Sequence, residues 1–87
     1  MMSMVMCSIY DAKAEAFMSP MTFQAKGQAV RSFADAVNKE DSEFNKHPED
    51  YSVFLLGTFD PKMGKIEVQK SPISLAIGIN LIERTED

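Results

Sequence analysis

The chain has 87 residues, of which 45% are hydrophobic and 25% charged, so it suffices for one small core and is too apolar to be disordered throughout. Thirteen acidic against nine basic residues give a net charge of −4, which opposes non-specific attraction to nucleic acid and to anionic membranes. The single cysteine excludes an intrachain disulfide and fits a reducing compartment. We therefore expect one domain over residues 1–87 in a cytoplasm.

The start of the chain lacks the basic front and the long apolar stretch of a signal peptide, and its first charged residue is Asp11. The longest uncharged run, 71–82, has twelve residues. A membrane-spanning helix needs about 20. The sequence therefore predicts neither secretion nor a membrane span.

The first two predicted elements lie before residue 19. Residues 4–10 form an apolar run that predicts an opening strand, in which Cys7 is a small buried hydrophobe. The alternative for this methionine-rich start is an adaptable binding surface. Residues 11–18 carry three alanines, which predict one or two helical turns that end at Ser19 and Pro20.

A long amphipathic helix is predicted over residues 26–39, after a brief extended connection at 21–24. Its apolar side chains fall at positions i, i+3, i+4 and i+7 and form one stripe, made by Val30, Phe33, Ala34 and Val37. The charged side chains on the opposite side of the helix are those of a solvated face. After this helix, Phe44 is expected to pack back as an anchor.

A β-hairpin is predicted over residues 51–69. The strand 51–59 has apolar side chains on both faces, which indicates a place in the middle of a sheet. The loop 60–64 combines Asp, Pro and Gly in the order of a tight reversal. The return strand 65–69 alternates, with Ile66 and Val68 expected on its buried face.

The last predicted element covers residues 73–81, after Pro72 ends the hairpin. Five apolar side chains alternate with small or polar ones, which predicts a strand. The alternative is a short helix with Ser71 as N-cap and Pro72 at its first position. Residues 83–87 are expected to fray.

Together these elements predict an α+β fold: an antiparallel sheet of three to four strands with one long amphipathic helix packed on one face. The uncovered side chains of Phe54 and Leu56, or an open edge strand, would favour self-association. We therefore expect a homo-oligomer, a dimer or larger.

No catalytic, metal or cofactor site is predicted. His47, the single histidine, could act as a general base, but no Ser, Cys or Asp stands at a catalytic spacing, and a plain loop residue explains it. The acidic residues lack the ligand spacing of a calcium loop, and the glycines are too isolated to cradle a phosphate. We expect a protein that is not an enzyme.

Nucleic-acid binding is the function that the residues leave open. Single-strand binders combine cations for the backbone with aromatic rings for base stacking. Residues of both kinds occur in the first half of this chain, and the candidate binding residues are Tyr10, Lys13, Phe23, Lys26, Arg31, Lys46 and His47.

Several segments resemble one known family. They are 8–16 (SIYDAKAEA), 26–33 (KGQAVRSF), 46–51 (KHPEDY) with 56–60 (LGTFD), and 71–75 (SPISL). In this order they are similar to the small non-structural protein of gokushoviruses, circular single-stranded DNA phages of the Microviridae. The resemblance implies a protein of the bacterial host cytoplasm, outside the capsid. It further implies binding of single-stranded DNA in genome replication, or a part in the switch to single-strand synthesis.

Two classes of function follow. In the first, an oligomer gathers the basic candidates into a groove for single-stranded DNA. In the second, the protein is an adaptor or regulator that docks on the replication initiator or a host factor through its acidic turns or a sheet edge. The arrangement of charge in space separates the two classes.

Overall fold

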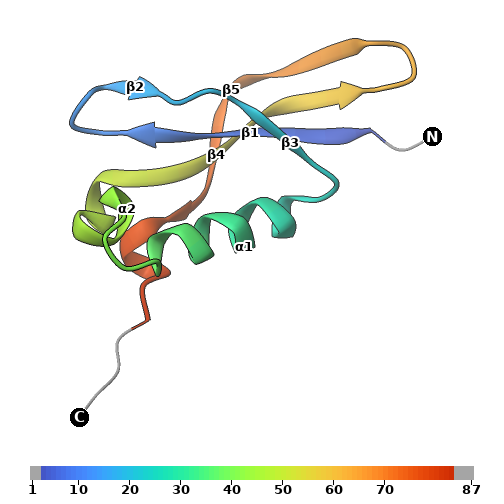
Figure 1. The fold of residues 1–87 in the computed structure, drawn as a ribbon. Helices are drawn as coiled ribbons and strands as arrows, with labels where there is room; N and C mark the ends of the chain where they lie inside the picture. Colours follow the sequence, from blue (N-terminus) through green and yellow to red (C-terminus); the bar gives the residue numbers. More distant parts are fainter. Residues whose placement is uncertain (1–2, 84–87) are drawn as a thin grey trace.

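The computed structural model describes residues 3–83 and shows an antiparallel sheet with one main helix on one face (Figure 1). Strand β1 (Met4–Asp11) pairs along one edge with β2 (Ala16–Phe17) and β3 (Met21–Phe23), and along the other with β4 (Tyr51–Asp60). Strand β5 (Lys65–Ile77) pairs with β4 and forms the far edge. The α+β prediction and the central position of β4 are confirmed.

Helix α1 (Lys26–Val37) has 12 residues and packs on the sheet through the predicted apolar stripe. The core contains Phe33 and Val37 of the helix together with Cys7, Val53 and Leu55 of the central strands. The helix is shorter than predicted. Its end is set by an amide side chain, because Asn38 Nδ2 donates to the carbonyl of Ala34 at 2.8 Å and to that of Leu81 at 3.0 Å.

The rest of the chain adds one short α-helix and two 3-10 helices. Helix α2 (Glu43–Lys46) begins at Ser42, whose hydroxyl accepts from the backbone N–H of Asn45 at 3.0 Å. The 3-10 helix η1 (Pro48–Asp50) leads into β4, and η2 (Gly78–Asn80) follows β5. Phe44 packs between Phe33 and Tyr51, with ring centroids 5.8 and 4.7 Å away, so its predicted role as an anchor is confirmed.

The prediction of helical turns over residues 11–18 is wrong. This segment is a tight turn followed by β2. The carboxylate of Asp11 accepts from the backbone N–H groups of Lys13 at 3.0 Å and Ala14 at 3.3 Å, and Glu15 closes the turn with a φ of 57°. The side-chain turn and the pairing of β2 with β1 outweigh the helix propensity of the alanines.

The prediction that Pro72 separates two strands is also wrong. β5 runs through this proline as one strand of 13 residues and ends at Ile77, short of the predicted Leu81. Pro72 is tolerated because β5 lies at the sheet edge. The register shifts there, since Gly57 pairs with Val68 while Leu55 pairs with Ile73. The predicted strand, and not the alternative helix, is nevertheless confirmed for residues 73–77.

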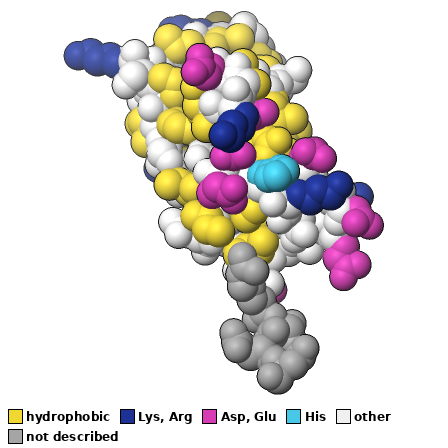
Figure 2. Space-filling model, turned by 90° about the vertical axis from the view of Figure 1, so that its left-hand side faces the viewer, with side chains coloured by type: hydrophobic (Ala, Val, Ile, Leu, Met, Phe, Trp, Pro, Cys, Tyr) yellow, Lys and Arg dark blue, Asp and Glu magenta, His cyan; other side chains and the backbone are white. Residues whose placement is uncertain are grey.

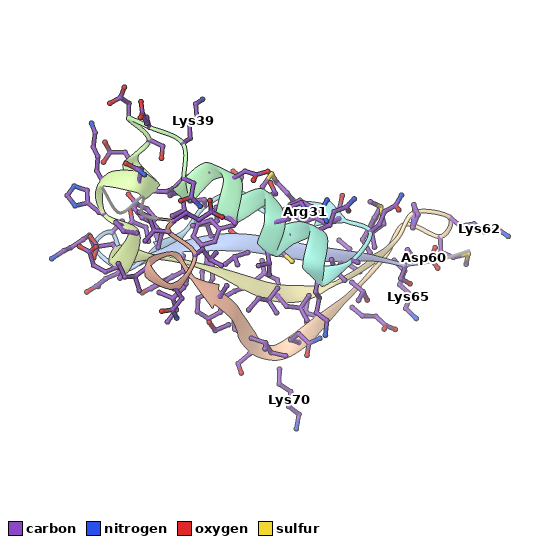
Figure 3. The ribbon with its side chains drawn as sticks, turned by 90° about the horizontal axis from the view of Figure 1, so that it is seen from below. Arg31, Lys39, Asp60, Lys62, Lys65 and Lys70 are labelled. Atoms are coloured by element: carbon purple, nitrogen blue, oxygen red, sulfur yellow. The ribbon has the colours of Figure 1, made fainter. Side chains whose placement is uncertain are left out.

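The predicted tight reversal at 60–64 is confirmed. The carboxylate of Asp60 accepts from the backbone N–H of Lys62 at 2.9 Å, and Gly64 has a φ of 68°. Residues 57–68 thus form an arm of the β4–β5 hairpin, with Lys62 at its tip (Figure 3). The expected burial of Ile66 and Val68 is wrong, because 53% and 78% of their surfaces are exposed.

In the described part of the chain, no helix is long and apolar enough to cross a membrane. Residues 84–87, where fraying was expected, lie outside that part, as do residues 1 and 2.

Candidate nucleic-acid interface

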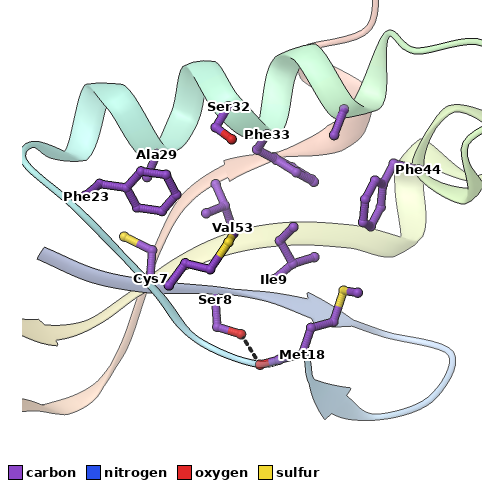
Figure 4. A pocket seen from close by; sticks show the side chains of 12 residues that line it. Cys7, Ser8, Ile9, Met18, Phe23, Ala29, Ser32, Phe33, Phe44 and Val53 are labelled. Atoms are coloured by element: carbon purple, nitrogen blue, oxygen red, sulfur yellow. Dashed lines mark hydrogen bonds between the residues drawn. The ribbon is translucent and has the colours of Figure 1, made fainter.

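The sheet has a face that α1 does not cover, here called the open face. Cys7 and Ile9 of β1 point toward α1, and Ser8 between them points away, toward the carbonyl of Met18, to which it donates a hydrogen bond (Figure 4). Strand pairing carries this alternation across the sheet, because paired residues share a face. The side chains of the open face are those of Met4, Met6, Ser8, Tyr10, Phe17, Thr22, Ser52, Phe54, Phe59, Ile66, Val68, Ser74 and Ile77.

Three aromatic rings meet on the open face. Tyr10 is paired with Phe17 in the register of β1 and β2, and their ring centroids are 4.9 Å apart. Phe54 of β4 lies 6.1 Å from Tyr10 and 5.5 Å from Phe17, edge-on to both rings. We call Tyr10, Phe17 and Phe54 the aromatic trio. Phe17 is 42% exposed, and the other two are half-buried.

The open face has an unusual electrostatic character for an acidic protein. None of its side chains, as the register assigns them within residues 3–83, is charged. Its polar groups are the hydroxyls of serines and of Thr22. A ligand on this face therefore meets aromatic and aliphatic surface without a carboxylate in direct contact.

The structure separates the two aromatic residues that the sequence analysis put together. Tyr10 is in the aromatic trio. Phe23, paired with Val5, lies on the opposite face of the sheet, beside Ala29 of α1 (Figure 4). Phe23 helps to line an apolar cavity of about 260 Å³ between α1 and the sheet, so it is not part of the open face.

The predicted cations do not form one groove. Lys26 and Arg31 are exposed on α1, on the other side of the sheet from the aromatic trio. Lys13 is in the β1–β2 turn, where the N–H of Ala12 donates to the carbonyl of Asp50 at 2.9 Å. The basic groove expected for the first class of function is therefore not supported by these positions.

Lys46 and His47 lie among acids at one end of the molecule, here called the acidic end. Lys46 Nζ is 3.9 Å from a carboxylate oxygen of Glu43. Five carboxylates fall between residues 40 and 50, and Figure 2 shows acidic side chains gathered around the single histidine. Burial raises the pKa of the Tyr51 hydroxyl in this region, and the charges of Asp11, Glu43 and Asp50 raise it further.

The acidic end also holds the group that comes closest to a cation site in the described residues. Ligand atoms of His47, Glu49 and Asp50 lie within 4.8 Å of one another. His47 and Glu49 are exposed, so water competes for any ion there. Such an arrangement is common in solvated turns and does not define a metal centre.

Sequence reasoning missed two members of the aromatic trio. The sequence pattern predicts Phe17 in a helix and Phe54 on an uncovered apolar face. The sequence feature that could have indicated the trio is Asp11, whose side chain closes the turn after β1. This turn folds β2 back and places Phe17 opposite Tyr10. The cations of the arm and of β5, Lys62, Lys65 and Lys70, were also missed; Figure 3 shows them away from the acidic end.

The comparison with protein families gives one match. The model of the family described as phage ORF5 protein covers residues 4–81. Comparison with curated proteins and with solved structures returned no significant match. Because the family model spans nearly every strand and helix described above, the chain belongs to the phage ORF5 protein family.

Proposed function

We propose that this phage protein is a non-catalytic single-stranded DNA-binding protein that stacks bases on the aromatic trio. The observation that carries the proposal is the meeting of Tyr10, Phe17 and Phe54 on a sheet face without charged side chains. The resemblance to the gokushovirus non-structural protein supports single-stranded DNA as the ligand. It also supports a role in genome replication or the switch to single-strand synthesis, in the cytoplasm of an infected bacterium.

Stacking suits this surface because every base has a π-face, whereas paired bases in a duplex are already stacked. Base–aromatic stacking contributes about 1–3 kcal/mol per base in single-strand binders. Phe17 is the most exposed ring of the trio; Phe54 supports it edge-on from β4, and the tilted ring of Tyr10 supports it from β1. The trio therefore offers a preformed place for an unpaired base.

Phosphate contacts are a smaller part of the proposed interaction. Lys13 in the turn after β1 and Lys70 on β5 are exposed and lie on strands or turns adjoining the open face. The net charge of −4 opposes accumulation of the polyanion around the protein. We therefore expect binding that depends on bases more than on charge.

Titration of fluorescently labelled oligonucleotides tests the proposal. A single-stranded oligonucleotide should bind more tightly than its duplex, and its log affinity should fall against log salt with a slope of only about −0.7 to −2, the value for one to three phosphates. Phe17→Leu, which keeps apolar area but removes the ring, should weaken binding about 5- to 100-fold, as expected for one lost stacking contact.

Arg31→Gln serves as the matched control for charge, because Arg31 is exposed on the helix side of the sheet. We expect this variant to bind like the wild type. Equal affinity for duplex and single strand, or a loss with Arg31→Gln that matches the loss with Phe17→Leu, would contradict base stacking on the open face. Absence of binding at low salt would contradict the whole proposal.

A second candidate is a protein-interaction adaptor, which the acidic end favours. Ile79, which is 41% exposed, lines a surface hollow there together with Glu49 and Glu83. A basic partner such as a replication initiator fits this chemistry. Crosslinking in infected cells tests this candidate: the partner should be lost with Glu49→Lys and retained with Phe17→Leu, which leaves the acidic end intact.

A further inference from the structure

We infer that a second copy of the chain docks on the arm and makes the protein a two-fold dimer. The docking surface consists of five apolar side chains on the open face, and we call it the arm patch: Met4, Met6, Phe59, Ile66 and Val68.

The arm patch is built by strand register. Met4, Phe59 and Ile66 form one row across β1, β4 and β5. Met6 and Val68 form the next row, on either side of Gly57, which contributes no side chain between them. The five side chains therefore belong to one continuous strip of three neighbouring strands.

Two members of the arm patch, Ile66 and Val68, are exposed to a degree that an isolated monomer does not explain. Val68 is 78% exposed and Ile66 is 53% exposed, although both are β-branched residues in a regular antiparallel ladder. Met63 at the adjacent tip is 73% exposed. Met4, Met6 and Phe59 are half-buried and continue this apolar surface, and none of the five members of the patch belongs to the buried cluster under α1. Contiguous exposed apolar surface of this kind marks an interface.

Charge indicates that the occupant is a second copy. A two-fold axis brings each residue near its own counterpart, so a charged surface would face itself with like charges. The arm patch has no charged member. The neighbouring charged residues Lys65 and Glu67 lie on the opposite face of β5 from the patch. They form an ion pair with each other, in which Lys65 Nζ is 3.6 Å from a carboxylate oxygen of Glu67. The acidic end, with five carboxylates between residues 40 and 50, would repel its own copy.

The size of the patch sets the strength of the contact. Stable interfaces bury about 1,200–2,000 Å² in total. Such an interface has about 20–30 residues a side, more than the arm patch and its tip contain, so we expect a reversible dimer whose population rises with concentration. This dimer differs from the sequence prediction, which placed self-association on Phe54 and Leu56 or on an open edge strand.

The consequence for DNA rests on the proposed function. The aromatic trio of Tyr10, Phe17 and Phe54 shares no residue with the arm patch, so a dimer joined at the two patches would carry two trios. One dimer would then hold two single-stranded segments. The association itself requires no DNA, so it is measured independently of the proposed function.

Sedimentation velocity over a range of protein concentrations tests the association. The wild type should pass from monomer to dimer as concentration rises. Val68→Glu should raise the dissociation constant at least about tenfold, because an unpaired carboxylate would be buried at the contact. Ile73→Glu is the matched control: Ile73 is 46% exposed on the same strand and pairs with Leu55 on the other face. It should dimerise like the wild type.

Crosslinking tests the two-fold geometry. Cys7 is the single cysteine and is 1% exposed, so a thiol introduced at the arm is the accessible one. Oxidised Val68→Cys should form a covalent dimer more readily than Ile73→Cys. A wild type that stays monomeric at all concentrations, an equal loss with Ile73→Glu, or equal crosslinking of the two cysteine variants would overturn the inference.

Discussion

Phe33→Ala should lower the free energy of unfolding by about 3–5 kcal/mol, the cost of removing a buried ring and leaving a cavity. Phe33 is 2% exposed and joins α1 to the sheet. Its ring also lies edge-on to Phe44, at 5.8 Å, so the anchor after α1 loses a partner. The change is large for a domain of this size, whose total stability is about 5–15 kcal/mol.

Thermal and urea denaturation followed by circular dichroism measure this effect. For a domain of 60–100 residues, each kcal/mol corresponds to about 4–8 °C in Tm, so Tm should fall by about 12 °C or more. Phe17→Ala is the control, since the same truncation at a ring that is 42% exposed should cost much less. Similar losses in the two variants would contradict the packing of α1 on the sheet through Phe33.

Gly57→Ala should destabilise the protein by about 3 kcal/mol, at the upper end of the range for overpacking. A Cβ at this position would lie 2.1 Å from the carbonyl oxygen of Glu67 and 2.9 Å from the Cα of Val68. Both obstacles are backbone, so the β4–β5 ladder itself would have to move. The arm should separate from β4 first.

Gly27→Ala is the matched control for this substitution. A Cβ at Gly27 meets no atom within 4 Å, and the residue lies in α1. Alanine should therefore stabilise the protein by about 0.5–1 kcal/mol through helix propensity. Chemical denaturation gives both values. A Gly57→Ala variant that is as stable as the wild type would contradict the close approach of β4 and β5.

The elements that the sequence predicted correctly are those fixed by local patterns. The stripe that contains Phe33 and Val37 determines which side of α1 is buried. Alternation in β4 buries Val53 and Leu55 as expected. The side chain of Asp60 and the positive φ of Gly64 close the reversal that their residue types indicate. In each case, the information lies within a few neighbouring residues.

The exposure of Ile66 and Val68 could not be predicted from alternation, because a period of two does not say which face meets the helix. The register decides this. Between Met6 and Cys7 the pairing of β1 with β4 shifts by one residue, since their partners are Gly57 and Leu55. The shift reverses the faces of the arm relative to the core.

The aromatic trio could be predicted only in part. Tyr10 was a candidate, but its contacts depend on residues 7 and 44 positions further along the chain. The Asp11 turn that brings Phe17 back competes with the helix propensity of the alanines after it, and local reasoning favoured the alanines. The basic candidates failed for a related reason, because closeness in sequence did not place Lys13, Lys26 and Lys46 on one surface.

Tyrosine fluorescence tests the central claim, base stacking on the trio, most directly. The chain has two tyrosines and no tryptophan, so Tyr51→Phe leaves Tyr10 as the single reporter and Tyr10→Phe leaves Tyr51. We predict that a single-stranded oligonucleotide quenches Tyr51→Phe strongly and Tyr10→Phe weakly, because stacking occurs at the trio and Tyr51 lies at the acidic end. Equal quenching of the two variants, or binding without quenching of Tyr10, would contradict the account.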